Sequence, residues 1–132
     1  MNAFLVDLDN KPGALATVTE AIAAKGVNLL GVSGTSCSDG GRVAIVTADD
    51  ATTRAVLQEK KLSFKELEAT ETSIGHVPGT LAKAARRLAE AGVNIEAIFP
   101  TGMTGNDISV AFVTDNPTKA KEALATVGGI RR

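Results

Sequence analysis

The sequence has few aromatic residues, one cysteine and one histidine. Aromatic residues make up 3% of the chain, with four Phe and neither Trp nor Tyr, within a hydrophobic share of 44%. The core must therefore be built from Ala, Val, Leu and Ile. Cys37 alone cannot form a disulfide framework, and with His76 it leaves too few ligands for a conventional zinc site. We expect no disulfide, no metal and no cofactor.

The chain also lacks an excess of charge and a long apolar segment. Fourteen Lys and Arg oppose fifteen Asp and Glu, which gives a net charge of −1. A nucleic-acid surface needs clustered Lys and Arg, so this balance argues against one. No apolar run approaches the roughly 18 residues that span a membrane. The N-terminus shows no signal-peptide pattern. We expect no membrane association and a cytoplasmic protein.

The most prominent feature of the sequence is an internal repeat. The pair Pro12-Gly13 recurs 66 residues later as Pro78-Gly79, and "VAIVT" from Val43 recurs 67 residues later as "VAFVT". One inserted loop residue explains the change of offset. The residues of the first copy that are identical in the second at the offset of 66 include Pro12, Gly13, Leu15, Ala16, Ala23, Gly26, Val27 and Asn28. The chain therefore reads as a duplication, with units at 1–67 and 68–132.

Each copy has the pattern of strand, helix, strand, strand and helix. In the first copy, residues 4–9 alternate as in a strand, and Leu15, Val18 and Ile22 recur at helical spacing before Gly26. The further predicted elements are strands at 27–33 and 42–47 around a turn at 37–41, a helix from Asp49 or Asp50, a helix marked by Leu81, Ala85 and Leu88, strands at 92–99 and 107–114, and a helix from Asn116-Pro117. This order predicts split βαβ units with helices on one face of an antiparallel sheet.

Two segments fit the repeat poorly. The stretch 62–75, "LSFKELEATETSIG", must supply the last strand of the first copy and the first strand of the second. It is β-compatible but weakly apolar, which favours an edge or a junction. The second copy has only "GGIRR" at 128–132 for a final strand. We expect that strand to be absent, very short or replaced by another part of the molecule.

The repeated segments resemble ACT domains, the small ligand-binding modules of amino-acid metabolism. The residues that carry the resemblance are "NKPGALATVTEAIAAKGVNLLGVS" and "HVPGTLAKAARRLAEAGVNIEAIF", each with P-G-x-L followed about a dozen residues later by G-V-N. The resemblance covers nearly the whole chain and weakens over 62–73 and after Val127. The sequence as a whole is similar to a stand-alone tandem-ACT protein with no catalytic domain. This implies an α+β fold of two ferredoxin-like βαββαβ units, with their sheets associated.

The resemblance also implies a non-enzymatic regulatory protein that holds an amino acid at the interface between units, near the first strand–helix loop. A homodimer is expected, and a partner enzyme of amino-acid metabolism is possible under this hypothesis. The matching positions are Asp9, Asn10, Lys11, Pro12, Gly13, Ala14, Leu15 and Asn28 in the first copy and Gly75, His76, Val77, Pro78, Gly79, Thr80, Leu81 and Asn94 in the second.

The chemistry of the first strand–helix loop, here called the corner, agrees with the binding of an amino acid. A helix N-terminus offers unpaired N–H groups to an anion, and Gly13 or Gly79 allows close approach to the backbone. Asp9 could pair with an ammonium group, and Asn10 or Asn28 could accept a hydrogen bond from it. Because the second corner is less polar, we expect the first to bind if only one does.

Other interpretations stay open at this point. The Pro-Gly corner could simply start a helix, both Asn residues could bond a turn, and His76 could be an exposed loop residue. A protein-interaction module that pairs its sheet edges with another chain is the alternative function. An acylphosphatase-like enzyme would want an Arg in the corner loop, where only Lys11 is present. We predict no catalytic residues.

Overall fold

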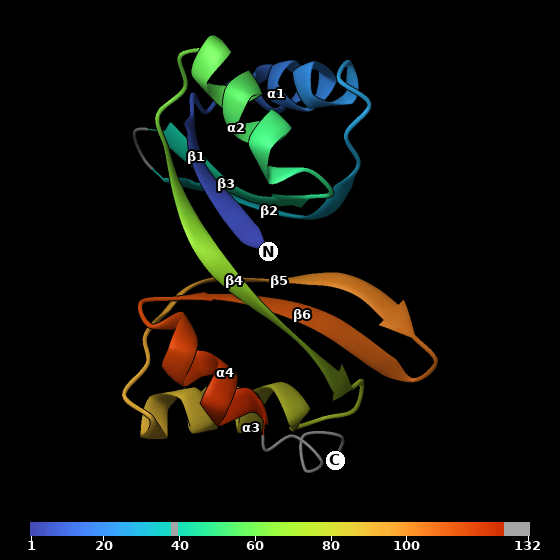
Figure 1. Ribbon diagram of the computed structural model, residues 1–132, viewed down its shortest axis with the longest axis vertical. Coiled ribbons are helices and arrows are strands. Elements are labelled where there is room, and N and C mark those ends of the chain that lie inside the picture. Colours follow the sequence, from blue (N-terminus) through green and yellow to red (C-terminus); the bar gives the residue numbers. More distant parts are fainter. Residues whose placement is uncertain (38–39, 126–132) are drawn as a thin grey trace. The chain divides into compact units, whose positions relative to one another are not determined.

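The computed structural model describes residues 1–37 and 40–125, and the chain divides into two compact units, Met1–Leu67 and Glu68–Arg132 (Figure 1). Unit 1 contains β1 (Asn2–Leu8), α1 (Ala14–Ala23), β2 (Leu29–Cys37), β3 (Gly40–Thr47), α2 (Asp50–Glu59) and the start of β4 (Phe64–Gly75). Unit 2 contains the rest of β4, then α3 (Thr80–Glu90), β5 (Ile95–Thr104), β6 (Asp107–Thr114) and α4 (Pro117–Ala125).

The strand order within each unit is that of a ferredoxin-like sheet. It is β2-β3-β1-β4 in unit 1 and β4-β6-β5 in unit 2. The pairs β1–β3, β2–β3, β4–β6 and β5–β6 are antiparallel. In each unit the two helices cover one face of that unit's sheet (Figure 1). The predicted fold class is confirmed.

Each unit has its own aliphatic core between sheet and helices. In unit 1, Val18 and Ile22 of α1 pack against Val6 of β1 and Val43 of β3. In unit 2, Leu88 of α3 belongs to the equivalent cluster. The predicted helical rows are only partly in the core, since Leu15 is 47% exposed and Leu81 is 48% exposed. Both leucines lie in the first turn of their helix, beyond the part that packs on the core.

The helices begin in two different ways. Gly13 and Gly79 precede α1 and α3 with φ of 89° and 93°, in the left-handed region that glycine adopts without strain, and neither helix has a side-chain cap. Asp49, by contrast, caps α2, because its Oδ1 accepts a hydrogen bond from the N–H of Thr52 at 3.0 Å. Hydrogen bonds from Thr52 hold the pKa of Asp49 below its usual value. Asn116 caps α4 in the same manner.

The segment that fitted the repeat poorly is one uninterrupted strand, β4, of 12 residues. The boundary between the units falls inside it, after Leu67. Its second part, Ala69–Gly75, pairs with β6. In the strand order β4 is the terminal strand of each unit, next to β1 in unit 1 and next to β6 in unit 2, so the strand lies at the junction and also at the edge of each unit's sheet. Polar residues are tolerated here because several positions of the strand, such as Glu68 and Glu71, are exposed.

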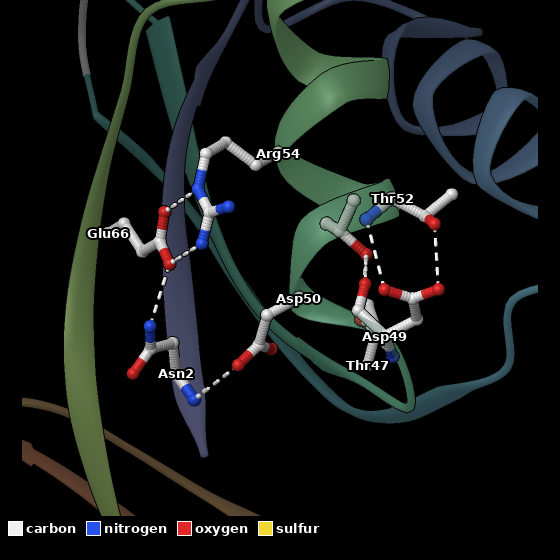
Figure 2. Close-up of polar contacts among 8 residues, drawn as sticks. Asn2, Thr47, Asp49, Asp50, Thr52, Arg54 and Glu66 are labelled. Atoms are coloured by element: carbon white, nitrogen blue, oxygen red, sulfur yellow. Dashed lines mark hydrogen bonds and ion pairs between the residues drawn. The ribbon is translucent and has the colours of Figure 1, made fainter.

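A polar network fastens the first part of β4 within unit 1 (Figure 2). Arg54 of α2 donates two hydrogen bonds of 2.6 Å to the carboxylate of Glu66, which also accepts one of 2.7 Å from the Asn2 side chain. The N–H of Asn2 donates to Asp50 at 3.3 Å. The bonds from Arg54 are the main reason that the pKa of Glu66 lies below its usual value.

Two predictions fall on residues outside the described ranges. They are the middle of the turn at 37–41, which includes Ser38 and Asp39, and the fate of a final strand at 128–132. Among the residues that the structure describes, no helix is long and apolar enough to cross a membrane.

Candidate functional site

The corner between β1 and α1 forms one wall of a surface pocket of about 480 Å³ in unit 1. The opposite wall is the β2–β3 hairpin. From the corner, the lining residues are Leu8, Asp9, Asn10, Lys11, Ala14 and Leu15. From the hairpin, they are Val32, Gly34, Thr35, Ser36, Gly41, Arg42 and Val43.

The pocket exists because the hairpin extends beyond the helix and carries small residues there. Val32 stands opposite Ile45, and Gly34 stands opposite Val43, so both lie on the helix-facing side of the sheet. A Cβ added to Gly34 or Gly41 would meet only the surrounding walls at 3.4 Å or more. These glycines therefore leave open the space that larger side chains would fill.

The corner combines both signs of charge with free backbone donors. Lys11 Nζ lies 3.7 Å from Asp9 Oδ2, and both side chains are largely exposed. The N–H groups of Leu15 and Ala16 have no hydrogen-bond partner among residues 1–37 and 40–125. No side chain caps α1, so the positive end of its dipole is directed at this loop. This arrangement suits a small zwitterion with one carboxylate and one ammonium group.

Arg42 lines the same pocket but its side chain is engaged elsewhere. It stands opposite Asp7 in the β1–β3 ladder, and Arg42 Nε donates to Asp7 Oδ1 at 3.0 Å. By strand alternation, Asp7 and Leu8 point to opposite faces, so the Asp7–Arg42 pair lies on the face away from the helices. In unit 2 the equivalent pair is Ser73 and Ser109.

Unit 2 has an equivalent pocket of about 430 Å³ with a different chemistry. No Asp, Glu, Lys or Arg lines it, and its polar side chains are His76 and Thr80. The Thr80 hydroxyl lies 2.6 Å from the Gly75 carbonyl oxygen and 3.1 Å from that of Val77, so it is used within the loop. The other lining residues are Ile74, Val77, Gly79, Leu81, Ile98, Phe99, Pro100, Ile108 and Val110.

The predicted site residues are thus divided between two pockets. Those that line the unit 1 pocket are Asp9, Asn10, Lys11, Ala14 and Leu15, and those that line the unit 2 pocket are His76, Val77, Gly79, Thr80 and Leu81. Pro12 and Gly13 shape the turn without lining it.

Asn28 and Asn94 line neither pocket. The carbonyl of Asn28 accepts from Ala48 N–H at 3.0 Å, and the carbonyl of Asn94 accepts from Asp115 N–H at 3.1 Å. The Asn94 N–H also donates to Asp115 Oδ1 at 2.9 Å. Both residues therefore take part in backbone connections at the start of the second strand of their unit.

Sequence reasoning missed the hairpin walls of both pockets. Val32 and Gly34 in unit 1 and Ile98 and Pro100 in unit 2 occupy equivalent positions, 66 residues apart. The available signal was an apolar residue followed two positions later by Gly in unit 1, or by Pro in unit 2, on a strand that should alternate. In the part of the chain that the structure describes, no group of three or more His, Cys, Asp or Glu could hold a metal ion.

The two units, each with a pocket at the corner between its first strand and first helix, define a duplicated ferredoxin-like module. The chain belongs to the ACT domain pair family, whose model matches residues 1–127. No curated protein matches the sequence.

Several solved structures are similar to this chain. A protein from Bacteroides thetaiotaomicron is 26% identical with a TM-score of 0.81, over 95% of this chain and 86% of that one. The ligand-free regulatory subunit of aspartate kinase from Thermus thermophilus is 20% identical with a TM-score of 0.66, over 95% and 89%. The structure of aspartokinase alpha and beta subunits is 20% identical with a TM-score of 0.70, over 95% of this chain and 90% of that one. The last two likenesses establish a shared fold.

Proposed function

We propose that this protein is a non-enzymatic regulatory protein that binds an amino acid at the corner of unit 1. The observation that carries the proposal is the pocket where Asp9, Asn10 and Lys11 meet the uncapped start of α1. The aspartate kinase regulatory subunits among its structural neighbours support a regulatory role. The partner under this proposal is an enzyme of amino-acid metabolism, and a homodimer and a cytoplasmic location remain predictions.

The pocket supplies a partner for each part of an amino acid. The carboxylate would accept hydrogen bonds from the N–H groups of Leu15 and Ala16, where the helix dipole favours an anion. The ammonium group would pair with Asp9 and donate to the Asn10 side-chain oxygen. The ligand side chain would then lie along the hairpin wall, against Val32.

A panel of the standard amino acids at millimolar concentration tests this by thermal unfolding. A ligand present at about 100 times its Kd stabilises the native state by about 2.7 kcal/mol, which raises Tm by several degrees. Asp9→Asn keeps the shape but removes the charge, so we expect it to weaken binding about tenfold or more. Glu20→Gln, on the same helix but outside the pocket, is the matched control.

A specific observation favours one second candidate, a protein-interaction module that uses the edge of β2. This strand is terminal in the strand order, largely exposed over nine residues, and contains neither Pro nor a charged residue. Such an edge is a template for another strand. The terminal strand of unit 2, β5, carries Glu96 and Pro100. If no amino acid moves Tm and a Thr35→Pro variant loses concentration-dependent association, this second function replaces the first.

A further inference from the structure

The pocket of unit 2 has the surface of a site for an apolar molecule. Three of its branched side chains are partly exposed, Val77 at 49%, Leu81 at 48% and Ile98 at 37%, and they surround a floor that includes Ile74 and Val110. Water in contact with these groups is released when an apolar ligand covers them, which is favourable.

Comparison with unit 1 shows that this apolar character is specific to unit 2. At equivalent positions Lys11 is replaced by Val77, Gly34 by Pro100 and Gly41 by Ile108. Each replacement removes a charge or adds hydrocarbon to the wall. A zwitterion would lose hydration here without finding a charged partner, and that loss is unfavourable. The two equivalent pockets therefore differ in the class of molecule that they can hold.

The size of the pocket selects a small molecule over a protein partner. Its volume of about 430 Å³ lies within the range of small-molecule sites, roughly 300–1,000 Å³. A stable protein interface buries about 800 Å² on each partner. The apolar side chains exposed at the pocket, Val77, Leu81, Ile98 and Pro100, are too few for that, and α3 beside them carries Lys83 and Arg86.

We propose that the unit 2 pocket is a second, separate site that binds a small aliphatic or aromatic molecule with at most one polar end group. The tail would lie among Leu81, Ile98 and Ile108, and the polar end would meet His76. The hydroxyl of Thr80 is already bonded, whereas the His76 imidazole forms no hydrogen bond within the described part of the chain. The inference goes beyond the amino-acid site of unit 1 and does not rest on it.

Three probes and amide chemical shifts test the proposal on the full chain. The probes are 4-methylpentanoate, its uncharged amide 4-methylpentanamide, and acetate, which has the carboxylate without the tail. Both tailed probes are expected to shift amides near the unit 2 pocket, and acetate is not. Equal binding of acetate, or no response to any probe at millimolar concentration, overturns the proposal. Shifts that depend on protein concentration and not on the probe would assign the pocket to a second copy and also overturn it.

Variants locate the binding and separate it from the unit 1 site. Ile98→Glu places a charge in the apolar wall and should weaken both tailed probes about tenfold or more. Leu30→Glu is the matched control, because Leu30 is 39% exposed on β2 and lines neither pocket. If Ile98→Glu does not fold, Leu81→Ser on α3 takes its place. Unchanged binding in a folded variant overturns the proposal, whereas Asp9→Asn should bind these probes like the parent protein.

Discussion

At the corner after its first strand, unit 1 carries Asp9, Asn10 and Lys11, whereas unit 2 closes its strand with Gly75 and continues with His76 and Val77. The turn into the helix is conserved in both, since Gly13 and Gly79 adopt nearly the same φ and the same ψ before their helices. The duplication has thus preserved what the turn requires and changed what the pocket presents. Backbone geometry and ligand chemistry are set by different residues of one loop.

The same separation is visible away from the pockets, at the start of the second helix in each unit. Asp49 caps α2 and Asn116 caps α4 with the same geometry. Behind the cap of unit 1, the hydroxyls of Thr47 and Thr53 lie 2.7 Å apart. In unit 2 the equivalent of Thr53 is Ala120, and Thr114 Oγ1 is buried with no hydrogen-bond partner among residues 40–125. Unit 1 therefore has a hydrogen-bonded pair of threonines, whereas unit 2 has only the first threonine of that pair, without its partner.

The largest expected effect tests whether the two cores contribute equally to the free energy of unfolding. Ile22→Ala in unit 1 and Leu88→Ala in unit 2 delete equivalent, fully buried side chains, so each should lower the free energy of unfolding by about 2–5 kcal/mol. Leu15→Ala and Leu81→Ala are the half-exposed controls and should cost much less. Denaturant unfolding measures all four. A loss below about 1 kcal/mol for either buried residue would contradict the equivalence.

A pair of smaller changes with opposite signs tests the threonine comparison. Thr47→Val removes a hydroxyl that is bonded to Thr53 and should destabilise the protein by about 1 kcal/mol. Thr114→Val removes an unpaired buried hydroxyl at nearly constant volume, so it should be neutral or stabilise by up to about 1 kcal/mol. Chemical denaturation gives both values. Equal destabilisation by the two variants would show that Thr114 has a partner after all.

The smallest expected effect concerns pH and the ion pairs that involve β4. Hydrogen bonds from Arg54 lower the pKa of Glu66, and Lys121 lowers that of Glu68. A lowered pKa stabilises the folded state fully above the unfolded value of about 4.3, and this contribution is lost as pH falls through the folded value. Thermal unfolding between about pH 2 and pH 6 should therefore be less pH-dependent in Glu66→Gln than in the parent.

The corresponding Glu68→Gln variant should change this pH dependence less, because Glu68 is 44% exposed against 19% for Glu66 and has one partner where Glu66 has two. Exposed ion pairs are also screened by solvent. If Glu68→Gln flattened the acid transition more than Glu66→Gln, the partly buried network of Figure 2 would not be the stronger of the two.

Much of the fold follows from local patterns in the sequence. The repeated Pro-Gly and Gly-Val-Asn positions predicted where α1 and α3 begin and end, because positive φ restricts those sites to glycine. The alternation in 4–9 predicted β1, although Leu5, on the face away from the helices, is also buried at 5%. Alternation alone gives one covered face and cannot reveal a second one.

The candidate site was harder to predict than the elements. Asp9, Asn10 and Lys11 are neighbours in sequence, so their loop was recognisable. The wall that faces them comes from Val32 and Gly34 on another strand, and only the β2–β3 register brings these residues opposite the corner. Asn28 and Asn94 were predicted from the same repeat; neither lines a pocket, and their backbone groups bond Ala48 and Asp115, which follow the third strand of their unit. Position in a repeat does not tell whether a residue reaches the pocket.

Residues Phe64 to Gly75 form one strand without a loop, and this limits how the two units can be separated experimentally. Because Leu67 and Glu68 are adjacent residues inside β4, a protease would find no turn between the units at which to cut. A fragment that ended at Leu67 would break the strand in its middle and remove Ala69–Gly75, the residues that pair with β6. The two copies can be told apart by their sequence, but dissecting them in the laboratory would mean cutting through secondary structure.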